Sequence, residues 1–117
     1  MEHICGVAAV SAQRYINSTC FWFKQDKEAC LLLGPRVGNT TKISAIYAAA
    51  NFWKHSDDIT SIHRATKRTL EEAGIDFNTG DETSYLVGNI FHRCDYTSLT
   101  QILSDLKTWT DLVIQKE

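Results

Sequence analysis

The segment LLLGPRVGNTTK, residues 31–42, combines residue types that bind phosphate. It leads from an apolar stretch through two glycines into a predicted helix, and the unpaired backbone N–H groups at the start of a helix bind anions. The residues expected to contact the phosphate supply positive charge, hydroxyl groups and an open backbone position: Arg36, Lys42, Thr40, Thr41 and Gly38. The segment therefore predicts a site for a phosphate-bearing molecule, such as a nucleotide or a nucleic-acid backbone.

A second basic feature lies on the next predicted helix. Arg64 and Arg68 share its outer face, and we expect them to support the phosphate contacts. The alternative is a solvated helix face, on which Arg68 and Lys67 pair with the glutamates four residues later. Both interpretations stay open from the sequence.

The glycine segment does not match the P-loop of nucleotide-binding proteins. Three residues separate its glycines where the P-loop has four, and Lys42 is followed by isoleucine where the P-loop has serine or threonine. The alternative to a phosphate site is therefore structural. In that case Pro35 and the glycines shape a turn, and Asn39 or Thr40 caps the helix.

Two His-x-Cys pairs suggest a metal site. His3 with Cys5, and His92 with Cys94, would each share one face of a predicted strand, and neighbouring strands would bring all four side chains together as zinc ligands. The alternative is that the cysteines are small core residues and the histidines lie at strand ends. Because the spacing is not that of known zinc modules, we predict no metal and no cofactor.

The pattern along the chain predicts a single α+β domain over residues 1–117. Apolar, β-branched or aromatic runs predict strands, and apolar residues at helical spacing predict helices. A Ser-x-x-Gln capping box opens the last helix. The predicted order is three antiparallel strands (4–10, 18–24 and 29–33), a helix from Thr40, a helix over Asp58–Ala73, a fourth strand over Tyr85–Arg93, and a helix over 98–115.

Two helices carry more apolar surface than one core contact needs. The helix from Thr40 is apolar nearly all round, and Leu112 and Ile114 lie off the core stripe of the last helix. This surplus predicts a homodimer. An alternative use of the same surface is a protein-binding adaptor or inhibitor.

Composition favours an ordinary globular protein. The chain has 117 residues, 44% of them hydrophobic and 22% charged, with a net charge of −2, which argues against disorder and against a broad polycationic surface. No apolar run is long enough for a transmembrane helix, and we expect no signal peptide and no membrane partner. Four cysteines at irregular spacing favour reduced thiols, and hence a cytoplasmic location.

The segment that contains FWFKQDKEAC and AAANFWK, within about residues 18–54, resembles the ribonuclease H family, in which hairpin-linked strands lead into an alanine-rich helix. The resemblance implies a metal-dependent nuclease fold. The family's helix glutamate falls on Ser44, however, and the first predicted strand has no aspartate, so a shared fold implies an inactive or divergent nuclease. The stretch CGVAAV resembles the start of class II glutamine amidotransferases, but four residues precede Cys5 and the chain is too short for that domain, so we reject this function.

These patterns favour a small cytoplasmic binding protein without catalytic activity. Its expected ligand is a phosphate-bearing molecule at the junction of the third strand and the first helix. A protein-binding adaptor and a divergent nuclease are the alternatives.

Overall fold

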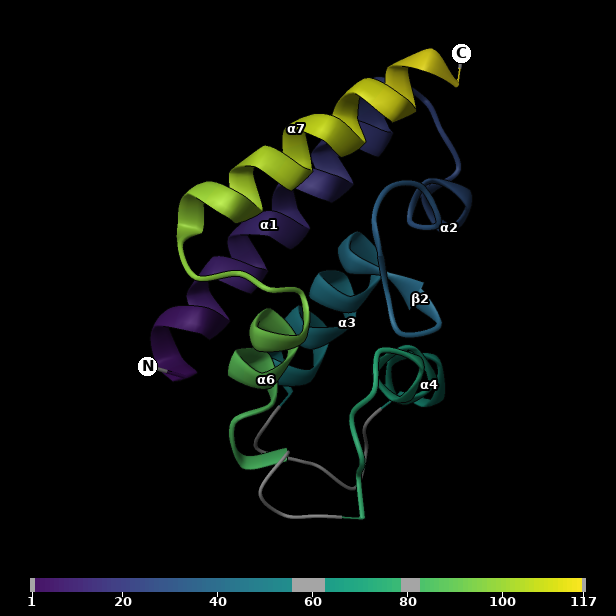
Figure 1. The fold of residues 1–117 in the computed structure, drawn as a ribbon. Coiled ribbons are helices and arrows are strands. Elements are labelled where there is room, and N and C mark those ends of the chain that lie inside the picture. Colours follow the sequence, from purple (N-terminus) through teal and green to yellow (C-terminus); the bar gives the residue numbers. More distant parts are fainter. Residues whose placement is uncertain (1, 56–62, 79–82, 117) are drawn as a thin grey trace.

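Helices dominate the structure, a computed structural model that describes residues 2–55, 63–78 and 83–116. The elements are α1 (Glu2–Trp22), α2 (Lys27–Cys30), β1 (Arg36–Val37), β2 (Thr40–Thr41), α3 (Lys42–Lys54), α4 (Arg64–Glu72), α6 (Leu86–Arg93) and α7 (Leu99–Gln115) (Figure 1). β1 and β2 form a small antiparallel hairpin that pairs Arg36 with Thr41 and Val37 with Thr40. Within the described residues, no helix is long and apolar enough to cross a lipid bilayer.

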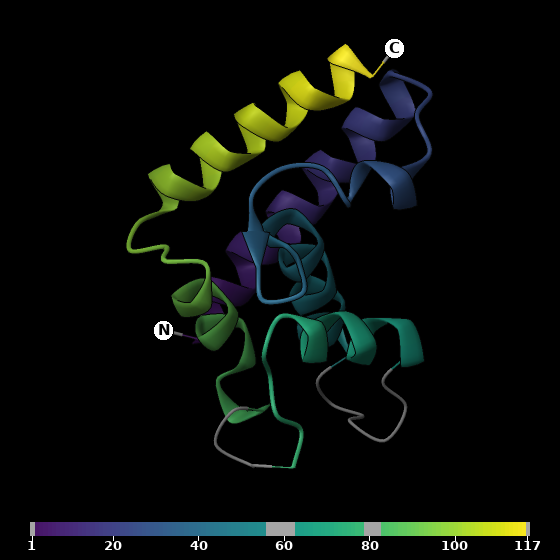
Figure 2. The ribbon, with the colours of Figure 1, turned by 45° about the vertical axis from the view of Figure 1, so that its right-hand side comes forward.

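Helix α3 lies at the centre of the fold. It packs against α1, α4, α6 and α7. Figures 1 and 2 show α1 and α7 running side by side along one side of the molecule, whereas α4 lies on the opposite side of α3. The apolar surplus predicted on this helix is therefore used inside the monomer, because seven of its thirteen residues are buried.

The predicted α+β fold is wrong. In the described part of the chain, the only strands are the two-residue β1 and β2. The first two predicted strands, 4–10 and 18–24, lie in or at the end of the single helix α1. The third run, 29–33, covers the end of α2 and the turn after it, and the fourth, Tyr85–Arg93, is α6 with its N-cap residue.

The physical reason is the spacing of the buried residues. The buried positions of α1 recur every three or four residues, which is the helical period: Gly6, Ala9, Ala12, Gln13, Ile16, Thr19 and Cys20. Several of its bulky residues, including Val7, Phe21 and Trp22, are instead exposed, and they are of the types that favour strands. In α6, the pairs Leu86–Val87 and Ile90–Phe91 are buried at the same helical spacing.

The helices that the sequence predicted are present with shifted starts. The helix expected from Thr40 begins at Lys42, and its N-cap is Thr41, not Asn39 or Thr40: the Thr41 hydroxyl accepts a 3.1 Å hydrogen bond from the Ser44 N–H. The helix expected over Asp58–Ala73 corresponds to α4. The part of that prediction before residue 63 lies outside the described residues.

The last helix confirms its predicted capping box between Ser98 and Gln101. Its buried residues follow one stripe: Ile102, Leu106, Trp109 and Val113. Leu99 and Leu103, which helical spacing predicts to be in contact with the core, are instead 56% and 65% exposed.

Two long-range contacts tie the ends of the chain to the centre. The indole N–H of the fully buried Trp109 donates a 2.8 Å hydrogen bond to the carbonyl of Cys30, which joins α7 to α2. The Glu2 carboxylate accepts hydrogen bonds of 3.0 Å from the N–H groups of Val87 and Gly88. A residue of α1 therefore caps the amino end of α6, where a negative charge is favourable.

Buried acidic protons make stability sensitive to alkaline pH. Burial raises the pKa of the Cys94 thiol from 9.0 to about 12, and burial together with a hydrogen bond to Asp105 raises the pKa of Tyr96. The unfolded chain releases these protons at lower pH than the folded chain does. We therefore expect the free energy of unfolding to be unaffected by these groups below pH 9 and to fall as pH rises from there toward 12, by about 1.4 kcal/mol per pH unit for each retained proton.

Urea unfolding at a series of pH values measures this slope. Cys94→Ala removes one of these protons, so its unfolding free energy should fall less steeply than that of the wild type over the same pH interval. Equal slopes in the two proteins would contradict the role of this thiol.

Candidate functional site

The two threonines of the predicted phosphate segment lie inside the protein. Thr41 is fully buried and Thr40 is 5% exposed. The Thr41 hydroxyl donates to the carbonyl of Leu31 and accepts from the N–H of Ser44. The hydroxyl therefore both donates to and accepts from the protein's own backbone.

Gly38 and Lys42 also face neighbouring parts of the fold. Gly38 has a positive φ of 55°, and a Cβ added there would lie 2.5 Å from the carbonyl oxygen of Glu72. The next residue, Asn39, donates its N–H to that same carbonyl at 2.8 Å. The Lys42 ammonium lies 5.4 Å from the centroid of the Tyr96 ring, in a cation–π contact.

The three predicted arginines are exposed, at different places. Arg36 lies on the hairpin, which packs against the carboxyl end of α4 at Glu72. Arg64 is the first residue of α4, eight residues earlier, and therefore about 12 Å away along the helix axis. The structure thus brings five of the predicted residues together in and beside the hairpin, and it places Arg64 at the opposite end of α4. Arg68 lies one helical turn before Glu72.

The two His-x-Cys pairs do not share faces, because they lie on or at the end of helices. Residues i and i+2 of a helix point about 200° apart. His3 contacts the Trp53 ring, with centroids 5.7 Å apart, and Cys94 is buried. Within residues 2–55, 63–78 and 83–116, no group of three His, Cys, Asp or Glu side chains is placed to hold a metal ion.

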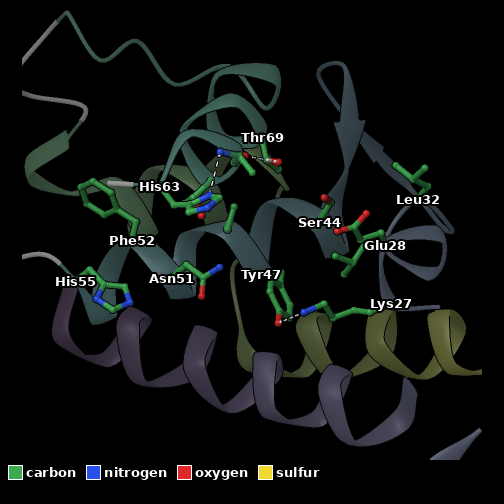
Figure 3. Close-up of a pocket in the computed structure, with 14 residues that line it drawn as sticks. Lys27, Glu28, Leu32, Ser44, Tyr47, Asn51, Phe52, His55, His63 and Thr69 are labelled. Carbon is green, nitrogen blue, oxygen red and sulfur yellow. Dashed lines mark hydrogen bonds between the residues drawn. The ribbon is translucent and has the colours of Figure 1, made fainter. Parts of the chain in front are cut away.

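A pocket of about 840 Å³ lies between α2, α3 and α4 (Figure 3). This volume is in the range of small-molecule sites. Its lining is Lys27, Glu28, Leu31, Leu32, Ser44, Tyr47, Ala48, Asn51, Phe52, His55, His63, Ala65, Thr66 and Thr69.

A hydrogen-bonded network fixes the polar groups on the α3 side of the pocket. The Tyr47 hydroxyl donates to Asn17 and accepts from the Lys27 ammonium, both at 2.9 Å. The buried Gln13 donates to the Asn51 side-chain oxygen at 2.7 Å, so the oxygen faces α1 and the amide nitrogen faces the pocket (Figure 3). Because residues of α1 hydrogen-bond to Tyr47 and Asn51 of α3, these polar groups are held in place before any ligand binds.

Two histidines lie at the other end of the pocket (Figure 3). The Nδ1 atom of His63 accepts a 3.2 Å hydrogen bond from the N–H of Ala65 and thereby caps α4. In this arrangement the neutral ring carries its proton on Nε2, which makes Nε2 a donor. His55 ends α3 and is exposed.

The chemistry of the lining is rich in hydrogen-bond donors. Lys27 supplies an ammonium, Asn51 an amide and His63 an imidazole N–H, whereas Glu28 is the one carboxylate among the lining residues. Tyr47 and Phe52 add aromatic surface. The arrangement suits a ligand with several oxygen acceptors and one flat apolar part.

The sequence contained one signal of this pocket. On the predicted first helix, Ser44, Asn51 and His55 form a narrow polar strip, and in the structure all three line the pocket. The polar stretch QDKE, between the second and third predicted strands, predicts a hairpin turn and gives no sign that Lys27 begins α2 and lines a pocket. Helical spacing predicts His63 on the same outer face as Arg64, whereas in the structure it is the N-cap of α4.

No protein-family model, curated protein or solved structure matches this chain. The segment that resembles the ribonuclease H family, residues 18–54, covers the end of α1, α2, the hairpin and α3. The strands on which that resemblance depends are therefore helices and turns.

Proposed function

We propose that this protein is a non-catalytic binding protein for a small phosphate-bearing molecule of the nucleotide class, held in the pocket between α2, α3 and α4. The observation that carries the proposal is the set of donors on Lys27, Asn51 and His63, which line one pocket with a single carboxylate. The proposal keeps the ligand class predicted from the sequence and moves the site away from the hairpin, whose buried Thr41 hydroxyl already bonds to the backbone.

Each part of such a ligand has a matching group. Lys27 supplies the point charge that binds phosphate oxygens. The Asn51 amide and the His63 imidazole donate hydrogen bonds to further oxygens or to a base. The rings of Tyr47 and Phe52 offer apolar surface to a flat heterocycle.

A small molecule fits better than a nucleic-acid backbone. Binding an extended polyanion requires several cations along a surface, whereas this lining holds one lysine and the net charge of the chain is −2. Arg64 and Arg68 on α4 are exposed outside the lining, where they would raise the local concentration of anions.

We infer a cytoplasmic location for this activity. All four cysteines are free thiols, and Cys20, Cys30 and Cys94 are buried. Unpaired buried thiols suit a reducing compartment.

Isothermal titration calorimetry with adenosine and guanosine mono- and diphosphates, and with inorganic phosphate, tests the proposal. We expect at least one nucleotide to bind the wild type, and Lys27→Met to weaken that binding by about tenfold or more, because one charge-assisted hydrogen bond contributes about 1.5–3 kcal/mol. The matched control is Arg36→Met, which removes one positive charge from the exposed hairpin.

The control separates the pocket from the hairpin. Unchanged affinity in Arg36→Met together with loss in Lys27→Met supports the pocket. Loss in Arg36→Met with retention in Lys27→Met would return the site to the hairpin and reject the pocket. Absence of heat with every compound would reject the ligand class.

A further inference from the structure

The exposed apolar side chains are concentrated on one side of the molecule. Among the described residues, ten large apolar or aromatic side chains are exposed, and eight of them belong to α1 and α7. These two helices lie side by side, away from α4 and its side of the ligand pocket (Figures 1 and 2). Large exposed apolar patches mark interaction sites.

One end of this surface is concave. A groove of about 650 Å³ lies between residues 3–15 of α1 and the first half of α7. Ile4 and Val7 from α1, and Leu99 and Leu103 from α7, line it and are between 49% and 65% exposed. We call this feature the apolar groove.

The other end of α1 carries two protruding aromatic side chains. Phe21 and Trp22 are each 77% exposed and contact one another edge to face, with centroids 6.1 Å apart. Trp22 follows Ile4 by eighteen residues, which is five helical turns, so both lie on the same face of α1. Ser11 and Tyr15 occupy that face between them and are exposed and uncharged.

A groove and a protrusion on the same face of one helix complement each other under two-fold symmetry. We propose that a second copy of this chain occupies the apolar groove: the two α1 helices pack antiparallel, and Trp22 of each copy enters the groove of the other. In such an interface the same patch is used on both subunits. The symmetry axis then passes near position 13 of α1, between the uncharged Ser11 and Tyr15.

The exposed area is sufficient for a stable dimer. A fully buried aromatic side chain removes about 150–250 Å² from water, so Phe21 and Trp22, each 77% exposed, offer roughly 230–390 Å² together. A standard interface buries about 800 Å² on each partner. The two aromatic residues supply a quarter to a half of that area, and the six other exposed side chains of α1 and α7 add to it. The proposal does not depend on the ligand pocket, which lies between other helices.

Sedimentation velocity over a range of concentrations tests this dimer. We expect the wild type to sediment at twice 13.2 kDa at micromolar concentration. Trp22→Asp removes the protrusion and Leu103→Asp places a charge in the groove, and each should weaken dimerisation by more than about tenfold. Leu32→Asp is the matched control, because Leu32 has the same 65% exposure as Leu103 but lies outside α1 and α7. Circular dichroism checks that each variant is folded.

Mixing the two variants distinguishes this dimer from any other. A Trp22→Asp chain keeps its groove, and a Leu103→Asp chain keeps its Trp22. In the heterodimer, Trp22 of the Leu103→Asp chain can therefore enter the intact groove of the Trp22→Asp chain. Neither variant's homodimer can form this contact. Restored dimerisation in the mixture, with an unaffected Leu32→Asp control, supports the proposal. Three results would overturn it: a monomeric wild type, a dimer that persists in both variants, or a mixture that stays monomeric. A monomeric wild type would mean that the apolar groove binds a different partner.

Discussion

Replacing Trp109 with alanine is expected to lower the free energy of unfolding by about 3–5 kcal/mol, the cost of removing a large aromatic side chain from a packed core. Trp109 is fully buried in α7, and its indole N–H bonds to the Cys30 carbonyl. The substitution opens a cavity and leaves that carbonyl without its donor. Since small domains are stable by about 5–15 kcal/mol, chemical denaturation should detect a large part of the total stability being lost.

Trp109→Phe separates the contribution of packing from that of the hydrogen bond. It keeps most of the aromatic surface and removes the donor, so we expect a loss of about 1–3 kcal/mol. The two variants differ in the aromatic ring that phenylalanine keeps. If they destabilised the protein equally, packing of this ring would contribute less to stability than the indole hydrogen bond does. If neither changed the denaturation midpoint, α7 would not pack on α2 as the structure shows.

Gly38→Ala is expected to cost about 2–4 kcal/mol. The residue has a positive φ of 55°, and the added Cβ would lie 2.5 Å from the Glu72 carbonyl oxygen, which belongs to the backbone and cannot rotate away. Backbone strain and overpacking each contribute about 1–3 kcal/mol. The hairpin would have to move off α4 to relieve the contact.

Gly34→Ala is the matched control for this substitution. Gly34 also has a positive φ, of 97°, but no atom lies within 4 Å of a Cβ built there. This variant should therefore suffer only the backbone strain, about 1–2 kcal/mol. A loss in Gly38→Ala no greater than that in Gly34→Ala, measured by urea unfolding, would show that the hairpin does not rest on α4.

These glycines also show which features the sequence could not reveal. The segment around Gly38 contains the residue types of a phosphate loop, and only the position of Glu72 shows that the glycine is needed for close packing. The sequence predicts that Thr41 contacts a ligand, and only the structure shows that it caps α3. A contact between residues more than thirty positions apart leaves no local pattern in the sequence.

The fold was mispredicted where apolar runs were short and ambiguous. Val7, Phe21 and Trp22 have high strand propensity, yet they occupy the exposed face of α1, so they do not carry the helical period of the core. The small buried residues of α1, such as Gly6 and Ala9, carry the helical period with little hydrophobic signal. In α7 and α3, where large buried residues follow the helical spacing, the sequence predicted the helices correctly.

The most direct test of the proposed binding site is a two-dimensional ¹H–¹⁵N NMR titration with the nucleotide that binds most tightly in calorimetry. We predict that the largest saturable shifts occur at the amides of residues lining the pocket, including Ser44, Asn51 and Ala65, and that the shifts disappear in Lys27→Met. Shifts that cluster on the hairpin around Arg36, or a spectrum that does not change, would contradict the pocket as the binding site.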